Sequence, residues 1–101
     1  MKPRMRNIFE GKNILITGGA GSFGSAMLEH ILDYKPDVIR VLDNNEEKLF
    51  QLEQKFKECD SVRLLLGDIR NEDRLQRAVE DIDIILHAAA LKHVSSCEYN
   101  P

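Results

Sequence analysis

A glycine-rich turn between an apolar run and a helical pattern constrains this sequence more than any other feature. The apolar run covers residues 13–16, and the turn Thr-Gly-Gly-Ala-Gly-Ser-Phe-Gly covers residues 17–24, with Gly18, Gly21 and Gly24 spaced as G-x-x-G-x-x-G. A strand that turns sharply into a helix needs glycine where φ is positive or where a ligand must approach the backbone. The helix N-terminus then offers unpaired N–H groups to a pyrophosphate. The turn therefore predicts a dinucleotide site.

Glycine-rich turns are common, and the alternative interpretation is simply a tight strand-to-helix connection. Two further features favour the dinucleotide interpretation. Asp43 follows Gly24 by 19 residues and ends a second apolar run, which is close to the spacing at which an acid binds the adenosine ribose. A third apolar run ends in Gly67-Asp68-Ile69. Asp43 could instead cap a helix or be solvated, and Asp68 could form the turn before Asn71.

Predicted strands alternate with predicted helices along the chain. The strands are expected at 13–17, 38–42, 62–66 and 82–86, and the helices at about 22–33, 45–58 and 71–79. Periodicity places Phe23 on the buried face of the first helix, and either Asn44 or Asn45 could cap the second. This alternation predicts an α/β fold, the first half of a Rossmann-type doubly wound parallel sheet with strand order 3-2-1-4. We expect one partial domain over residues 1–101.

Composition excludes several classes of function. The chain has 101 residues and a net charge of −3, which gives no reason to expect binding to nucleic acid or to an anionic membrane. Its two cysteines, Cys59 and Cys97, lack metal-ligand spacing to any histidine and are expected to be reduced thiols. We expect a soluble, cytoplasmic protein without a metal. The exposed outer edge of the fourth strand predicts self-association or poor solubility when these residues are made alone. We also expect a homo-oligomer.

Several motifs together resemble one protein family. The glycine turn, the segment 67–70 and the segment His87-Ala88-Ala89-Ala90 resemble an extended short-chain dehydrogenase/reductase. The stretch Ala-Leu-Lys-His-Val at 90–94, followed by Glu-Tyr-Asn-Pro at 98–101, is similar to the polysaccharide-biosynthesis branch, the UDP-N-acetylglucosamine 4,6-dehydratases and their relatives. The resemblance covers residues 11–101.

The resemblance implies a role for each matching residue. The residues that would hold the pyrophosphate are Gly18, Gly21, Ser22, Phe23 and Gly24, and those that would hold the adenosine ribose are Asp43, Asn44 and Asn45. Asp68 and Ile69 would contact the adenine, and Ala88 and Ala90 would line the path to the nicotinamide. Lys92 would lie near the nicotinamide ribose or the sugar nucleotide, although a surface role for Lys92 and His93 is nearly as plausible. His87 ends a predicted buried strand, which favours a hydrogen-bonded core histidine over a general base.

The resemblance implies that the chain is the NAD(P)-binding portion of a UDP-N-acetylglucosamine 4,6-dehydratase. Such an enzyme eliminates water from a UDP-sugar. The alternatives are a UDP-sugar 4-epimerase, a dinucleotide-binding fragment without activity, and an interaction protein whose turn has lost its ligand. Family members are longer, and the catalytic Tyr-x-x-x-Lys is missing here: Tyr34 is followed by Val38, and Tyr99 lies too near the end. We therefore assign no catalytic residue, and we expect these residues alone to be an inert fragment.

The segment after the second predicted strand indicates the cofactor. Between Leu42 and Glu47 it contains no arginine or lysine, and Lys48 is the first cation. The phosphate that distinguishes NADP from NAD would meet the like charge of Asp43 there. We expect NAD, with NADP as the weaker ligand.

Overall fold

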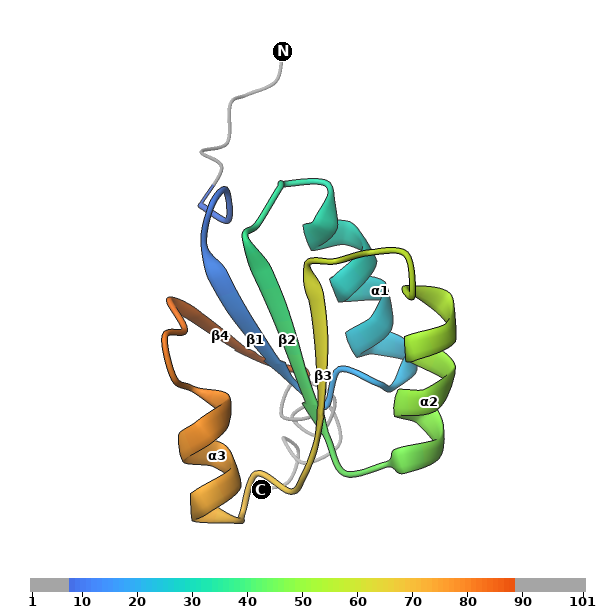
Figure 1. Ribbon diagram of the computed structural model, residues 1–101, viewed down its shortest axis with the longest axis vertical. Coiled ribbons are helices and arrows are strands. Elements are labelled where there is room, and N and C mark those ends of the chain that lie inside the picture. The colour runs from blue at the N-terminus through green and yellow to red at the C-terminus, as the bar shows by residue number, and fades with distance from the viewer. Residues whose placement is uncertain (1–7, 89–101) are drawn as a thin grey trace, which may run out of the picture.

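The computed structural model describes residues 8–88, which form a parallel four-stranded sheet covered by three helices (Figure 1). Its elements are β1 (Asn13–Thr17), α1 (Ser22–Leu32), β2 (Val38–Asp43), α2 (Glu46–Lys55), β3 (Val62–Leu66), α3 (Glu72–Ala78) and β4 (Ile84–His87). The strand order is β3-β2-β1-β4, and every neighbouring pair is parallel. The predicted fold class and strand order are confirmed.

The two faces of the sheet carry separate apolar clusters. Figure 1 shows α1 and α2 on one side of the sheet and α3 on the other. Because side chains alternate along a strand, neighbouring β1 residues contact different helices. The cluster under α1 and α2 contains Ile14, Ile16, Ile39, Val41, Leu28, Ile31, Leu49 and Leu52, and the cluster under α3 contains Leu15, Leu42 and Ala78. Residues 14–16 of β1 are fully buried, as expected for a central strand covered on both faces.

Arg40 joins the central part of β2 to the end of α3. Its Nη1 donates hydrogen bonds to the carbonyl oxygens of Ala78 at 2.8 Å and Glu80 at 3.1 Å. The last carbonyl groups of a helix have no partners within the helix, and a cation there also interacts favourably with the helix dipole. Arg40 therefore closes α3 with a side chain that comes from the sheet.

Two element boundaries differ from the sequence-based expectation by more than one residue. The fourth strand begins at Ile84, not at residue 82, because Asp81 has a φ of 61° and Asp83 bonds to the start of β1. The N–H of Asn13 donates to Asp83 Oδ2 at 2.9 Å, and the N–H of Asp83 donates to the Asn13 carbonyl at 2.8 Å. Helix α2 ends at Lys55 rather than near residue 58, since Phe56 leaves the helical conformation at φ −111° and ψ 23°.

Candidate functional site

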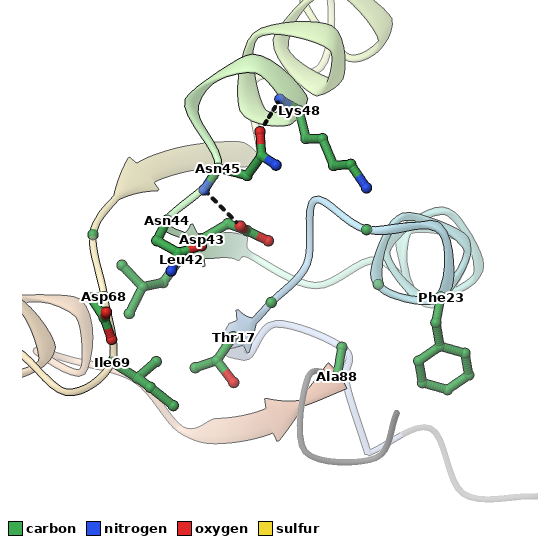
Figure 2. Close-up of a pocket in the computed structure, with 14 residues that line it drawn as sticks. Thr17, Phe23, Leu42, Asp43, Asn44, Asn45, Lys48, Asp68, Ile69 and Ala88 are labelled. Atoms are coloured by element: carbon green, nitrogen blue, oxygen red, sulfur yellow. Dashed lines mark hydrogen bonds between the residues drawn. The ribbon is translucent and has the colours of Figure 1, made fainter. Parts of the chain in front are cut away.

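A cavity of about 290 Å³ lies at the carboxyl ends of the strands, where the strand order reverses between β1 and β4 (Figure 2). Such a reversal is where open α/β sheets bind their ligands. Ten of the residues predicted from the sequence line this cavity: Gly18, Gly21, Phe23, Gly24, Asp43, Asn44, Asn45, Asp68, Ile69 and Ala88. The fold therefore brings together segments that are up to 70 residues apart in the sequence.

Among the predicted residues that the structure describes, Ser22 alone is not part of the cavity wall. Ser22 is the first residue of α1 and is exposed. Ala90 and Lys92 lie outside the described residues. The prediction missed Thr17, Leu42, Lys48 and Gly67, which also line the cavity. Thr17, Leu42 and Gly67 had a positional signal, since each lies at or next to a strand end beside a residue that was predicted. Lys48 lies in the first turn of α2 and had no such signal.

The glycines of the turn are required for different physical reasons. Gly18 has a φ of +72°, a conformation that favours glycine, and its N–H donates to the Leu42 carbonyl at 2.8 Å. A Cβ on Gly24 would lie 2.4 Å from the Cα of Gly19, so helix α1 can approach the turn only if residue 24 is glycine. A Cβ on Gly21 would meet nothing nearer than the Gly18 carbonyl oxygen at 3.9 Å. The structure thus leaves open space at Gly21, in the wall of the cavity.

Asp43 connects the glycine turn to the start of α2. Its Oδ2 accepts a hydrogen bond from the N–H of Ala20 at 3.0 Å, and its Oδ1 accepts one from the N–H of Asn45 at 2.9 Å. The Asn45 side chain in turn accepts from the N–H of Lys48 at 2.9 Å, so Asn45 is the cap of α2. A carboxylate offers about four lone pairs. Asp43 can therefore hold the loop and still accept ribose hydroxyls.

Asp68 forms the turn between β3 and α3. Its carboxylate accepts from the backbone N–H of Arg70 at 2.9 Å and pairs with the Arg70 guanidinium at 2.8 Å. The hydrogen bond from the Arg70 side chain, with that from its backbone, lowers the pKa of Asp68 to about 2. Asn71 then caps α3 by accepting from the N–H of Arg74 at 3.1 Å. The turn-forming role of Asp68 is present in the structure, and its contact with adenine stays a prediction.

Two residues have surroundings that differ from the expectation. Phe23 is 49% exposed and lines the cavity, so its predicted place on the buried face of α1 is wrong. Phe23 lies in the first turn of α1, and its side chain lines the cavity instead of joining the apolar cluster under the helix. His87 is exposed rather than part of the core, although its Nδ1 lies 2.8 Å from the Oγ1 of the buried Thr17. His87 therefore has the expected hydrogen bond but lies at the surface rather than in the core.

The described residues include no group of three or more histidine, cysteine or acidic side chains that could hold a metal ion. Between residues 8 and 88, no helix has the length and apolar character needed to cross a membrane. The cavity instead combines an open glycine wall, carboxylate and amide acceptors, and apolar surface from Phe23 and Ile69. This arrangement suits an elongated ligand with ribose hydroxyls, an anionic centre and flat ring surfaces.

A parallel sheet in the order β3-β2-β1-β4, with a glycine turn where the order reverses, defines a Rossmann-type dinucleotide-binding fold. Residues 14–101 match the family described as "Polysaccharide biosynthesis protein". The chain belongs to this family, and the resemblance inferred from the sequence is confirmed.

Curated relatives support the same assignment. The chain is 50% identical over 95 residues to an uncharacterized membrane protein of Methanocaldococcus jannaschii, covering 94% of this chain and 28% of that protein. It is 45% identical to a UDP-N-acetylglucosamine 4,6-dehydratase (inverting) of Campylobacter jejuni and 39% identical to a UDP-glucose 4-epimerase of Rickettsia bellii, in each case covering 93% of this chain and 28% of the relative. The chain thus spans little more than a quarter of the length of these relatives.

Solved structures resemble the fold over most of the chain. The structure of Pen from Bacillus thuringiensis is 48% identical with a TM-score of 0.79, covering 93% of this chain and 29% of Pen. The Bordetella bronchiseptica enzyme WbmF, crystallised in complex with NAD+ and UDP, has a TM-score of 0.65 at 21% identity and covers 81% of this chain and 24% of WbmF. At 21% identity, the likeness to WbmF shows only that the two proteins share a fold.

Proposed function

We propose that this chain forms part of the NAD-binding domain of an enzyme that modifies a nucleotide sugar. We further propose that the whole protein is a UDP-N-acetylglucosamine 4,6-dehydratase. The observation that carries the proposal is the cavity between the glycine turn and Asp43. Relatives with that activity share 45% of the residues over nearly the whole chain. The geometry and the family membership support the same class of enzyme.

The described residues fit a dinucleotide along the cavity wall. The open space at Gly21 would admit the pyrophosphate, and the first N–H groups of α1 would face its charge. The free lone pairs of Asp43 would accept the adenosine ribose hydroxyls, with Asn44 and Asn45 beside them. Asp68 and Ile69 would border the adenine, and Ala88 would border the path toward the nicotinamide. Ser22, Ala90 and Lys92 remain proposed contacts.

A bound nicotinamide would supply hydride transfer to and from the sugar, so that oxidation at C4 permits loss of water across C5 and C6. The proposed contribution of these residues is to bind and orient that cofactor. We propose NAD as the preferred form because Asp43 lies at the ribose end of the cavity, where the 2′-phosphate of NADP would meet its charge.

The proposal extends to location and assembly. Nucleotide sugars and nicotinamide cofactors are cytoplasmic metabolites, which supports a cytoplasmic protein with a UDP-sugar partner. We also propose a homo-oligomer, because β4 lies at the edge of the described sheet and an uncovered strand edge can pair with another chain. We propose no binding to nucleic acid or to a membrane.

A 4-epimerase is the second candidate, supported by the 39% identity to the Rickettsia bellii enzyme. Incubation of the whole protein with UDP-N-acetylglucosamine separates the two by mass spectrometry. A dehydratase gives a product lighter by one water, whereas an epimerase gives an isomer of unchanged mass. The 101-residue chain alone should bind NAD in a calorimetric titration without turning over the sugar. Failure to bind NAD would contradict the proposal.

A further inference from the structure

The carboxylate of Asp68 is held from outside the cavity by the side chain of Arg70. The Nε of Arg70 donates to Asp68 Oδ1 at 3.2 Å, and its Nη2 donates to Oδ2 at 2.8 Å. Asp68 lines the cavity, whereas Arg70 is not among the lining residues and its side chain is 86% exposed. Two parallel hydrogen bonds from one guanidinium group fix the plane of a carboxylate as well as its position. Arg70 therefore orients an acid of the cavity wall without entering the cavity.

The turn between β3 and α3 does not need this pair of side-chain bonds to form. The backbone N–H of Arg70 donates to Asp68 Oδ1 at 2.9 Å, and the N–H of Asn71 donates to the Asp68 carbonyl at 2.9 Å. The Asn71 side chain then caps α3. An ion pair with so exposed a cation contributes little to the stability of a fold. The pair is therefore better explained by what Asp68 presents to the cavity.

A donor on the cavity side can also reach the Asp68 carboxylate. The group offers about four lone pairs, and Arg70 uses two of them at Oδ1 and one at Oδ2. The Arg70 side-chain hydrogen bond is the largest cause of the lowered pKa of Asp68, and a hydrogen bond from the side chain of Asn44 is the last of the causes. Asn44 also lines the cavity, and Figure 2 shows the two residues in neighbouring loops at one side of it. A donor group of a ligand could therefore take the place of the Asn44 amide.

The charge of Asp68 decides which ligand group it can bind. Its pKa is about 2, chiefly because of the Arg70 side-chain hydrogen bond, so the group is ionised at neutral pH. An ionised carboxylate only accepts hydrogen bonds. An amino group on a ring would donate to it, whereas a ring carbonyl would set a second acceptor against it and leave both without a donor. Ile69, the next residue, is 43% exposed and lines the cavity, where it offers an apolar surface to the face of such a ring.

We propose that Arg70 is a positioning residue for the base of the cofactor: its guanidinium group orients the Asp68 carboxylate so that the cavity selects a purine with an amino group at C6 over one with a carbonyl group there. The inference rests on the proposed function, because it assumes that a dinucleotide occupies this cavity with its base beside Asp68 and Ile69. Without the guanidinium group the carboxylate can rotate toward solvent, since the Asp68 side chain is 34% exposed. The selectivity is then lost although every residue that lines the cavity is unchanged.

The test is a calorimetric titration of the chain with NAD and with deamino-NAD, in which a carbonyl group replaces the amino group at C6 of the purine. We expect the unmodified chain to bind NAD about tenfold more tightly than deamino-NAD. In Arg70→Met the affinity for NAD should fall about fivefold and that for deamino-NAD should change less than about twofold. Arg70→Lys keeps the charge but cannot bond both oxygens side by side, so it should also lose most of the preference. Arg77→Met is the matched control, since Arg77 lies in the last turn of α3 and does not line the cavity.

The ratio of the two affinities separates a positioning role from a structural one, because a loss of stability lowers both affinities and leaves their ratio unchanged. If the unmodified chain binds NAD but Arg70→Met keeps the preference, or lowers both affinities equally, Arg70 does not position the acid and the proposed function stands. The same holds if the unmodified chain binds both dinucleotides equally. A full preference in Arg70→Lys, or an equal loss of preference in Arg77→Met, would also overturn the inference. If the unmodified chain binds neither dinucleotide, the proposed function is wrong and the inference fails with it.

Discussion

The turn that follows β1 and the turn that follows β3 both lead a parallel strand into a helix at the edge of the same cavity, but they are held by different forces. The first depends on the absence of side chains: Gly18 has a positive φ, and Gly24 leaves no room for a Cβ. The second depends on side chains that bond to the backbone, Asp68 to the N–H of Arg70 and Asn71 to that of Arg74.

The difference predicts how each turn fails. The stability of a turn that depends on close backbone packing is insensitive to pH and salt, but an atom added at its contacts destabilises it. A turn held by polar side chains loses stability when its acceptor is removed or protonated. The turn after β2 lies between these cases, since Asp43 uses its carboxylate to hold the glycine turn. Substitutions at the three turns can separate the two forces.

The largest effect is expected for Gly24→Ala. The new Cβ would lie 2.4 Å from the Cα of Gly19 and 2.6 Å from the Gly18 carbonyl oxygen, so backbone must move. We expect the free energy of unfolding to fall by about 3 kcal/mol or more, measured by urea denaturation.

Gly21→Ala is the matched control, because its Cβ meets nothing nearer than 3.9 Å. Its cost should be about 1 kcal/mol or less, mainly from the poorer helix cap. The same substitution should weaken NAD binding, since the methyl group occupies open space in the cavity wall. Equal destabilisation by the two alanines would contradict a steric basis for the turn.

Removal of the Asp43 carboxylate should have the next largest effect. Asp43→Ala leaves the N–H groups of Ala20 and Asn45 without their acceptor, which should cost about 2 kcal/mol of unfolding free energy. Asp43→Asn keeps one oxygen acceptor and should cost less. Thermal unfolding of both variants measures the difference, and an Asp43→Ala variant as stable as the unmodified chain would show that the glycine turn needs no polar support.

The cap of α2 is expected to contribute a smaller amount. Asn45→Ala removes the acceptor for the N–H of Lys48 and should lower the unfolding free energy by about 1 kcal/mol. Asn45→Ser retains a side-chain oxygen at the cap and should lie within a few tenths of a kcal/mol of the unmodified chain. Denaturant titration distinguishes them, and a serine variant as unstable as the alanine variant would argue against capping as the cause.

The smallest effect is expected at Asp68 and appears only in acid. Its pKa is lowered from 3.8 to about 2, with the Arg70 side-chain hydrogen bond as the largest cause. An acid with a lowered folded-state pKa stabilises the fold above its unfolded-state pKa, and this contribution disappears as the pH falls through the folded-state value. The contribution should therefore be complete above about pH 4 and lost near pH 2. Unfolding measured across this range should be less pH-dependent in Asp68→Asn than in the unmodified chain.

The fold could be predicted closely because local patterns and packing agree. Strands β1 and β3 begin and end at the predicted residues, since apolar runs between polar turns leave little choice of register. The errors at Ile84, Phe23 and His87 arise where local sequence patterns do not decide the structure. The start of β4 depends on the bonds of Asp83 to Asn13, which are far apart in the sequence, and Phe23 lines a cavity that several distant segments form together.

The candidate site could be predicted at positions where one residue type is physically required. A positive φ at Gly18 and a strand-end acid at Asp43 leave clear signals in the sequence. The place of Lys48 could not be found in this way, because a lysine in the first turn of a helix usually faces solvent. Only the approach of α2 to the glycine turn brings that lysine into the cavity wall.

The bonds of Arg40 to the end of α3 have a consequence for motion within the domain. Helix α3 has seven residues, too few to persist without tertiary contacts, and fraying should begin at a free end. The guanidinium group joins that end to β2, at the centre of the sheet, so α3 should open only when the sheet opens. The segment that carries Asp68 is thereby anchored at both of its ends. Arg40 does not line the cavity, but its bonds to the end of α3 should slow the opening of the cavity wall that carries Asp68.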